Sequence, residues 1–122
     1  MVVAIFDSSK QIIERLVDMI AETEKDILFY NASSYNSAMD ILKEYKPDAV
    51  ILDWQLCANK GPGIVNEAGK VNDKAVVIIL AGYIDPYIKE QCEKLENKYL
   101  LDKYYDFEKI PAIIKAIRLN NK

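Results

Sequence analysis

Two aspartates and a lysine are the side chains of this sequence best suited to chemistry. Each follows a predominantly apolar segment: Asp7 follows residues 2–6, Asp53 follows residues 49–52, and Lys103 follows residues 99–102. Two carboxylates in one pocket repel each other and favour a hard cation such as Mg²⁺, while a lysine ammonium can hold phosphate. An aspartate placed there can attack phosphorus as a nucleophile, with the metal and the lysine neutralising charge on the transferred phosphoryl group.

Composition excludes several other functions. The chain has no histidine, which excludes catalytic triads that use histidine as base. Without histidine, its two cysteines are too few for a zinc site, and without a secretion signal we expect them to be free thiols and not a disulfide. A net charge of −3 gives no basic footprint for nucleic acid. No apolar run approaches the roughly 20 residues of a membrane span. The N-terminal segment lacks the features of a signal peptide, so we expect a cytoplasmic protein with one domain over residues 1–122.

Apolar segments alternate with amphipathic segments along the chain. Residues 49–52 are apolar without polar alternation, which is typical of a strand buried on both faces of a parallel sheet. Strands are predicted at residues 2–6, 26–31, 49–53, 75–80 and 99–102. Helices are predicted to begin after Ser8-Ser9, after Ser33 or Ser34, at Gly61-Pro62, at Asp85-Pro86 and near Pro111. This alternation predicts an α/β fold with a doubly wound, five-stranded parallel sheet and five helices.

Some local features are predicted less directly. We expect Gly69 to end the helix that begins at Gly61, and residues 54–60 to form an irregular loop that exposes Trp54. Pro111 allows two interpretations. It lies in the first turn of the last helix, or residues 106–108 form a separate turn.

The order of the strands decides whether the three side chains meet. In the flavodoxin-like order 2-1-3-4-5, the carboxyl ends of the first and third strands are neighbours at the switch point. Asp7 and Asp53 would then share one crevice, and Lys103 would reach in from the far side. The alternative interpretation is that Asp53 only caps the turn that follows it.

Three motifs resemble those of response regulator receiver domains of two-component signalling, and together they span essentially the whole chain. Residues 4–10 (Ala-Ile-Phe-Asp-Ser-Ser-Lys) resemble the start of the family's acidic site. Residues 47–53 (Pro-Asp-Ala-Val-Ile-Leu-Asp) resemble its phosphoacceptor strand, and residues 101–106 (Leu-Asp-Lys-Tyr-Tyr-Asp) resemble its Leu-x-Lys-Pro-Phe-Asp segment.

The resemblance implies that Asp53 accepts a phosphoryl group from a histidine kinase or a phosphotransfer protein. It also implies that Asp7, Asp53 and the backbone carbonyl of Gln55 hold Mg²⁺, and that Lys103 contacts a phosphoryl oxygen. The chain would then be a signalling domain and not an enzyme, because no general base or substrate pocket beyond the acidic cluster is visible.

Five positions depart from the family pattern: Ser8, Cys57, Ala81, Leu100 and Tyr104. Ser8 replaces a second acid, so Mg²⁺ binding should be weak, and Ala81 lacks the switch hydroxyl that would bond a phosphoryl oxygen. Leu100, with Tyr99 beside it, stands at the aromatic switch position. Cys57 and Tyr104 each replace a proline. Since a non-proline cis bond costs about 2.5–4 kcal/mol, the loop at Tyr104 is either trans and rearranged or strained.

These departures leave two hypotheses open. In the first, Asp53 is phosphorylated and the output is coupled by a route that does not need the usual switch pair. In the second, an atypical receiver acts as a phosphorylation-independent protein-interaction module, because a ligand without differential contact energy shifts no population.

Tyrosines mark a possible partner surface. Tyrosines 83, 87, 99, 104 and 105 fall near the face that the fourth helix, the fifth strand and the last helix would form. Aromatic surfaces favour protein partners, so we expect a homodimer or an output protein there, and neither nucleic acid nor membrane. Packing around the fifth strand is the alternative for Tyr99 and Tyr105. The end of the chain, directly after the last helix, fits a stand-alone domain or the front of a longer protein alike.

Overall fold

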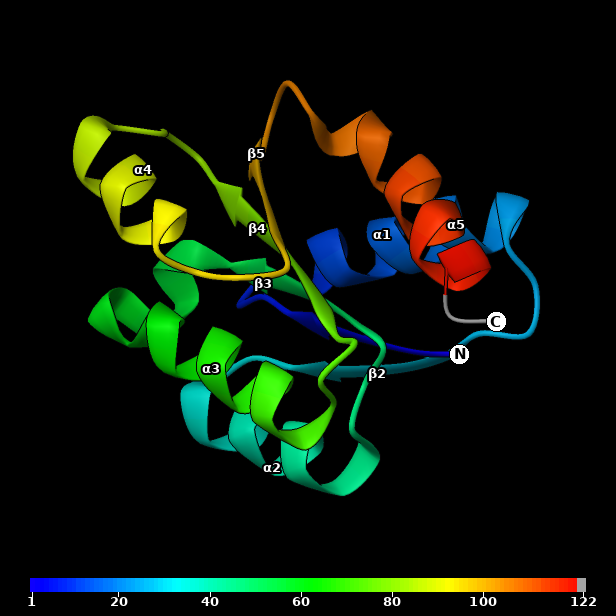
Figure 1. Cartoon of the computed structure of the whole chain (residues 1–122). Helices are drawn as coiled ribbons and strands as arrows, with labels where there is room; N and C mark the ends of the chain where they lie inside the picture. The colour runs from blue at the N-terminus through cyan, green and yellow to red at the C-terminus, as the bar shows by residue number, and fades with distance from the viewer. Residues whose placement is uncertain (121–122) are drawn as a thin grey trace.

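The computed structural model describes residues 1–120, in which a parallel sheet lies between two layers of helices (Figure 1). The described chain forms five strands in the order β2-β1-β3-β4-β5, with every neighbouring pair parallel. The predicted fold class and strand order are therefore confirmed. The strands are β1 (Val2–Phe6), β2 (Leu28–Ala32), β3 (Ala49–Asp53), β4 (Val76–Ala81) and β5 (Lys98–Asp102).

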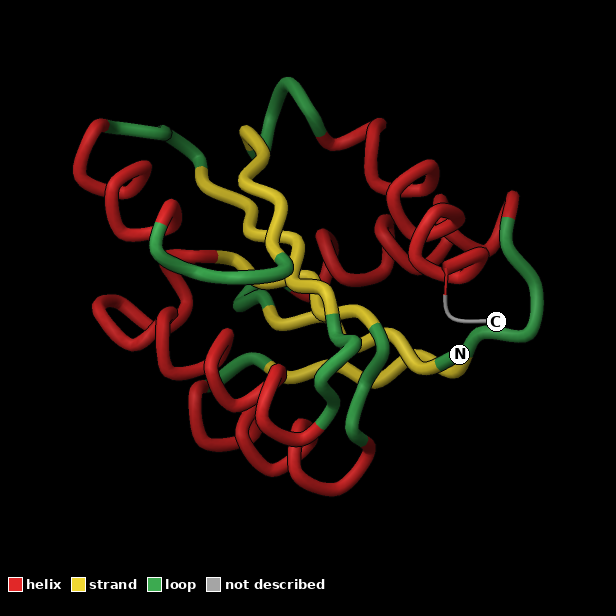
Figure 2. The backbone as a smooth tube through the Cα atoms, viewed as in Figure 1, coloured by secondary structure: helices red, strands yellow, loops and turns green. Residues whose placement is uncertain are grey.

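Helices cover both faces of the sheet (Figures 1 and 2). The α-helices are α1 (Lys10–Thr23), α2 (Tyr35–Tyr45), α3 (Gly61–Val71), α4 (Pro86–Glu93) and α5 (Ile110–Asn120). Two short 3-10 helices precede α3 and α5, namely η1 (Trp54–Lys60) and η2 (Phe107–Lys109). Within residues 1–120, none of the helices combines the length and the apolar character needed to cross a bilayer.

Successive residues of each central strand face opposite layers, which gives the protein two cores. Ile51 of β3 packs in the core under α1 and α5, whereas Val50 and Leu52 pack in the core under α2, α3 and α4. All three side chains are essentially inaccessible to solvent. The apolar run without polar alternation therefore corresponds to a strand covered on both faces, as predicted.

The predicted boundaries at Gly69 and Asp26 are wrong. The helix α3 continues through Gly69 to Val71, because no glycine of the described chain adopts the left-handed conformation that commonly ends a helix. The second strand begins at Leu28 and not at Asp26, because Asp26 itself turns the chain with a φ of 61°.

The predicted exposure of Trp54 is also wrong, since its side chain is only 5% exposed. Its ring lies against the first residue of α3, so that a Cβ atom on Gly61 would be 2.6 Å from Cζ3 of Trp54. Trp54 therefore belongs to the core under α2, α3 and α4.

Both interpretations of Pro111 hold in part. The separate turn η2 forms, and α5 then begins at Ile110 with Pro111 in its first turn. A proline is tolerated there, because the first N–H groups of a helix have no partner within the helix.

Candidate functional site

Asp7, Asp53 and Lys103 come together at the carboxyl edge of the sheet. Phe6 of β1 lies beside Leu52 of β3, so the aspartates that follow them leave the sheet as neighbours. Lys103 follows β5 and reaches past the end of β4. Its Nζ atom lies 2.9 Å from Oδ2 of Asp7 and 3.4 Å from Oδ2 of Asp53.

The Asp7 carboxylate is fixed from two directions. The backbone N–H of Asp7 donates to the carbonyl of Ala32 at 3.1 Å, which extends the β1–β2 pairing to the end of the strand. Its Oδ1 atom accepts from the backbone N–H of Ser9 at 2.8 Å, while Oδ2 accepts from Lys103. Because Asp7 is only 2% exposed, these partners take the place of water around the carboxylate.

Asp53 both caps the turn that follows it and faces the lysine. Its Oδ1 atom accepts from the backbone N–H of Gln55 at 3.4 Å, at the start of η1, and its Oδ2 atom points to Lys103. Capping and chemistry therefore do not exclude each other at this residue, because they use different oxygen atoms.

Burial and charge shift the protonation of the group. Burial raises the pKa of the Asp53 carboxyl; the ammonium of Lys103 opposes this shift and the charge of Asp7 adds to it. Burial on its own lowers the pKa of Lys103. The hydrogen bond to Asp7 and the charges of Asp53 and Asp7 outweigh that effect, so the pKa of Lys103 lies above its ordinary value. The ammonium is thus a permanent cation between two carboxylates.

The site offers carboxylate oxygens, which are the type of ligand that Mg²⁺ prefers, but only two side chains of the described residues supply them. Asp7 and Asp53 already converge on one cation, the ammonium of Lys103, which indicates that their oxygens can share a metal ion. However, the described residues contain no cluster of three metal-binding side chains. Ser8, where a third carboxylate would lie next to Asp7, has a hydroxyl and is exposed to solvent.

Of the positions that depart from the motifs, Ala81 lies next to the backbone of Lys103. Ala81 ends β4 and is buried, and its carbonyl accepts the backbone N–H of Lys103 at 2.9 Å, so it contributes backbone but no hydroxyl. Leu100 is partly buried and packs against the core under α2, α3 and α4. The side chain of Cys57 lies outside the described residues.

The loop after Lys103 contains a feature that the motif comparison did not reveal. No peptide bond of residues 1–120 is cis, so the bond before Tyr104 is trans. The Asp102 carboxylate accepts the backbone N–H groups of Tyr104 and Tyr105 at 2.8 and 2.9 Å. Asp106 accepts the N–H of Asp102 at 2.9 Å. An aspartate before a turn is the signal that could have indicated these bonds.

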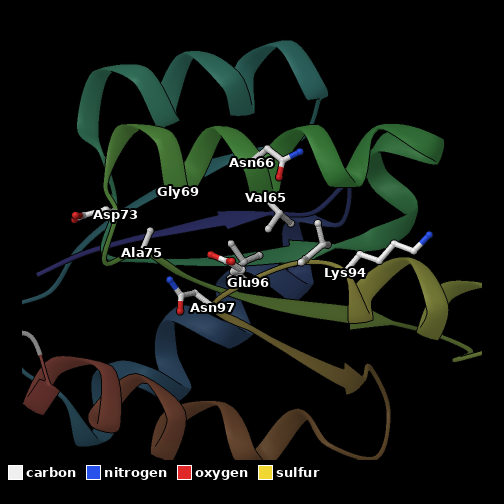
Figure 3. A pocket seen from close by; sticks show the side chains of 10 residues that line it. Val65, Asn66, Gly69, Asp73, Ala75, Lys94, Glu96 and Asn97 are labelled. Carbon is white, nitrogen blue, oxygen red and sulfur yellow. The ribbon is translucent and has the colours of Figure 1, made fainter.

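A hollow of about 400 Å³ between α3 and the turn before β5 lies away from this chemistry (Figure 3). Its lining includes Ala75 and Asn97, which precede β4 and β5, so it sits at the opposite edge of the sheet from Asp53. Figure 3 shows the side chains of Asp73 and Lys94 extending in opposite directions. The charges of Asp73 and Lys94 therefore do not converge in this hollow, whereas the charges around Lys103 do.

Tyrosine rings extend into solvent around α4 and the β5–α5 loop. Tyr83, Tyr87, Tyr104 and Tyr105 are all more than half exposed, and Tyr105 reaches 88%. Tyr99 of β5 is 42% exposed. The packing interpretation of Tyr105 is therefore wrong, because a residue in a solvent-facing loop has no core to enter.

A comparison with protein families identifies the family to which this chain is similar. The family model described as the response regulator receiver domain matches residues 3–115, which include Asp7, Asp53 and Lys103. No curated protein sequence matches the chain.

Solved structures share the fold at low sequence identity. A two-component response regulator of the LuxR family from Aurantimonas sp. SI85-9A1 has a TM-score of 0.81 at 16% identity, covering 98% of this chain and 85% of that one. A DNA-binding response regulator of the LuxR family from Staphylococcus aureus has a TM-score of 0.75 at 22% identity, covering 95% and 97%. The response regulator domain of Thermotoga maritima CheB has a TM-score of 0.70 at 17% identity, covering 98% and 94%. On the strength of the family match and the shared fold, the chain belongs to the response regulator receiver domains of two-component systems.

Proposed function

We propose that this receiver accepts a phosphoryl group on Asp53, in the cytoplasm, from a histidine kinase or a phosphotransfer protein, with residues 1–122 acting as one unit. Phosphorylation and Mg²⁺ binding are typical of the family. The observation that carries the proposal is the ammonium of Lys103, which lies 3.4 Å from Oδ2 of Asp53 and 2.9 Å from Oδ2 of Asp7.

The proposed step needs a nucleophile and a fixed positive charge. A carboxylate oxygen of Asp53 attacks phosphorus and forms an O–P bond, while the P–N bond to the partner's histidine breaks and the imidazole takes up a proton. Lys103 lies beside the attacking carboxylate, so its charge can stabilise the phosphoryl oxygens as they approach. Since the ammonium is already held by Asp7, little reorganisation is required.

We propose Mg²⁺ as the cofactor, bound weakly by Asp7, Asp53 and the backbone carbonyl of Gln55. When bound, the ion would supply further positive charge for the phosphoryl oxygens. The oxygen donors support this proposal, and Ser8 in place of an acid supports weak binding, because ligand charge sets much of the affinity for such ions.

Incubation with acetyl phosphate and Mg²⁺, followed by intact-mass measurement, tests the proposed function. The wild-type protein should gain one phosphoryl group and Asp53→Asn should gain none. Asp40→Asn, which alters an exposed carboxylate on α2, is the matched control and should behave as wild type. The proposal fails if the wild type gains nothing at any Mg²⁺ concentration, or if Asp53→Asn gains as much as the control.

A phosphorylation-independent interaction module is the second candidate, and Ala81 favours it. Without a hydroxyl at the end of β4, a phosphoryl group on Asp53 has no side chain there to pull inward, so the two forms of the domain differ little in contact energy. Partner binding measured with phosphorylated and unphosphorylated protein separates the candidates: equal affinities support the module, and unequal affinities support control by phosphate.

The proposed partner surface is the face made by α4, β5 and α5. Tyr87 on α4 and Tyr99 on β5 expose aromatic rings there, and aromatic side chains are enriched at protein interfaces. An output protein or a second copy of the chain would bury them. Sedimentation of wild type and of Tyr87→Ala tests the homodimer: a dimer that weakens in the variant supports it, and a monomer at all concentrations contradicts it.

A further inference from the structure

The backbone on both sides of Lys103 is held by hydrogen bonds. On one side, the N–H of Lys103 donates to the carbonyl of Ala81 at 2.9 Å, which continues the β4–β5 pairing. On the other side, one oxygen of Asp102, Oδ1, accepts the N–H groups of Tyr104 at 2.8 Å and Tyr105 at 2.9 Å. The chain thus turns around the side chain of Asp102, which directly precedes Lys103.

Asp106 closes the same turn from its other end. Its Oδ2 atom accepts the N–H of Asp102 at 2.9 Å, and its own N–H donates to the carbonyl of Asp102 at 3.0 Å. Its Oδ1 atom accepts from Nζ of Lys109 at 2.9 Å, which orients the carboxylate. Asp102 and Asp106 are therefore joined by two hydrogen bonds, one to the Asp106 carboxylate and one between backbone groups.

Little side-chain packing supports this loop. Tyr104 and Tyr105 are 76% and 88% exposed. A Cβ atom added to Gly82 would lie 3.5 Å from Cε2 of Tyr104, which is an ordinary van der Waals distance, so the ring lies near Gly82 without close packing. Because a lysine side chain has a long flexible stem, its ammonium stays over two carboxylates only if its backbone is held in place. On the side after Lys103, the hydrogen bonds of the Asp102 carboxylate to Tyr104 and Tyr105 can hold this backbone, and the bond to Ala81 holds the other side.

We propose that Asp102 is a positioning residue, whose carboxylate fixes the turn that aims Lys103 at Asp7 and Asp53. The bond to the N–H of Tyr104 is one that a proline at this position could not make, because proline has no backbone N–H. Asp102 and Tyr104 therefore act as a pair. For its effect on phosphoryl transfer this inference rests on the proposed function, but the position of Lys103 can be measured without it.

Acetylation of lysines by acetic anhydride, followed residue by residue with mass spectrometry, reports where the ammonium of Lys103 lies. Loss of the turn in Asp102→Ala should raise the acetylation rate of Lys103 about fivefold to tenfold, the equivalent of one or two hydrogen bonds. Lys98, at the other end of β5, is the internal control and should keep its rate. Asp102→Asn should stay close to wild type, because an amide oxygen can still accept both N–H groups.

Two results would overturn the inference. One is an unchanged rate at Lys103 in Asp102→Ala while Lys98 also stays unchanged. The other is fast amide exchange at Tyr104 and Tyr105 in the wild type, a measurement that does not depend on the folding of a variant. The amides of Tyr104 and Tyr105 should exchange with solvent at least about tenfold more slowly than in the unfolded chain, and free exchange would show that the turn is not held.

Measuring the phosphorylation of the same variants distinguishes a failure of this inference from a failure of the proposed function. If both hold, Asp102→Ala is phosphorylated more slowly than Asp102→Asn. If the wild type takes no phosphoryl group, the proposed function fails, while the acetylation and exchange measurements still decide the role of Asp102.

Discussion

Nζ of Lys103 donates a hydrogen bond of 2.9 Å to Oδ2 of Asp7, which lies 96 residues earlier in the chain. This contact joins the ends of β1 and β5 across the ends of β3 and β4, and it places a cation beside Asp53. The pocket therefore contains two carboxylates and one ammonium that belong to the protein itself. The ammonium would supply part of the positive charge for an incoming phosphoryl group, and Mg²⁺ would have to compete with it for the same oxygens.

Restoring an acid at position 8 should strengthen metal binding. Ser8→Asp adds a third carboxylate next to Asp7, and we expect the dissociation constant for Mg²⁺ to fall about tenfold, or roughly 1.4 kcal/mol. Trp54, the single tryptophan of the chain, directly follows Asp53, so its fluorescence can report the titration. Asn66→Asp adds the same charge on α3, in the lining of the separate hollow, and should leave the affinity unchanged. Equal affinities in Ser8→Asp and wild type would mean that residue 8 does not face the pocket.

Removing the internal cation should separate metal binding from chemistry. Lys103→Met leaves two carboxylates without their ammonium, so Mg²⁺ should bind more tightly. The rate of phosphorylation at saturating Mg²⁺ should nevertheless fall about 100-fold, since a charge that stabilises the transition state is lost. Fluorescence titration gives the first quantity, and the time course of intact mass gives the second. A variant that is phosphorylated at the wild-type rate would contradict the role assigned to Lys103.

The raised pKa of Asp53 predicts how stability depends on pH in the absence of metal. Because the folded protein holds this proton more tightly than the unfolded chain, ionised Asp53 lowers the free energy of unfolding at neutral pH. That loss disappears as the pH falls through the folded pKa toward the unfolded value of about 3.9. Asp53→Asn should therefore be more stable than wild type at neutral pH, and the difference should shrink on acidification. Urea unfolding in the presence of a chelator measures it; a constant difference, or a less stable variant, would argue against this electrostatic account.

Two glycines of α3 should respond in opposite ways to alanine. A Cβ atom on Gly61 would lie 2.6 Å from the ring of Trp54, so Gly61→Ala should cost about 1–3 kcal/mol of stability through overpacking. A Cβ atom on Gly69 would contact nothing within 4 Å, and Gly69→Ala should add about 0.5–1 kcal/mol by improving helix propensity. Urea unfolding followed by tryptophan fluorescence compares the pair. An unaffected Gly61→Ala would mean that Trp54 does not pack against this residue of α3. A destabilised Gly69→Ala would contradict the open space expected around Gly69.

The fold follows from patterns that can be read from the sequence. The alternation of apolar and amphipathic segments indicated parallel β-α units, and the flavodoxin-like strand order made Asp7 and Asp53 neighbours. These features depend on burial over whole elements, to which many residues contribute. Single misplaced boundaries, such as the one at Gly69, do not change the topology.

Details that depend on one contact between side chains, or on one backbone path, could not be predicted. Trp54 is buried because Gly61, seven positions later, leaves room for its ring, and no local pattern contains that information. The turn around Asp102 depends on the path that the backbone takes when Tyr104 replaces a proline. The meeting of Lys103 with the acidic pair was expected, but its simultaneous contact with both carboxylates depends on this turn.

Locating the phosphoryl group within the chain decides whether Asp53 is the phosphoacceptor. After incubation with acetyl phosphate and Mg²⁺, reduction with borohydride converts an acyl phosphate to an alcohol that peptide mass spectrometry can assign to one residue. We expect wild-type protein to carry this mark at Asp53, and Lys103→Met to carry far less of it after the same time. A mark on another aspartate, or none on Asp53 in the wild type, would contradict the account.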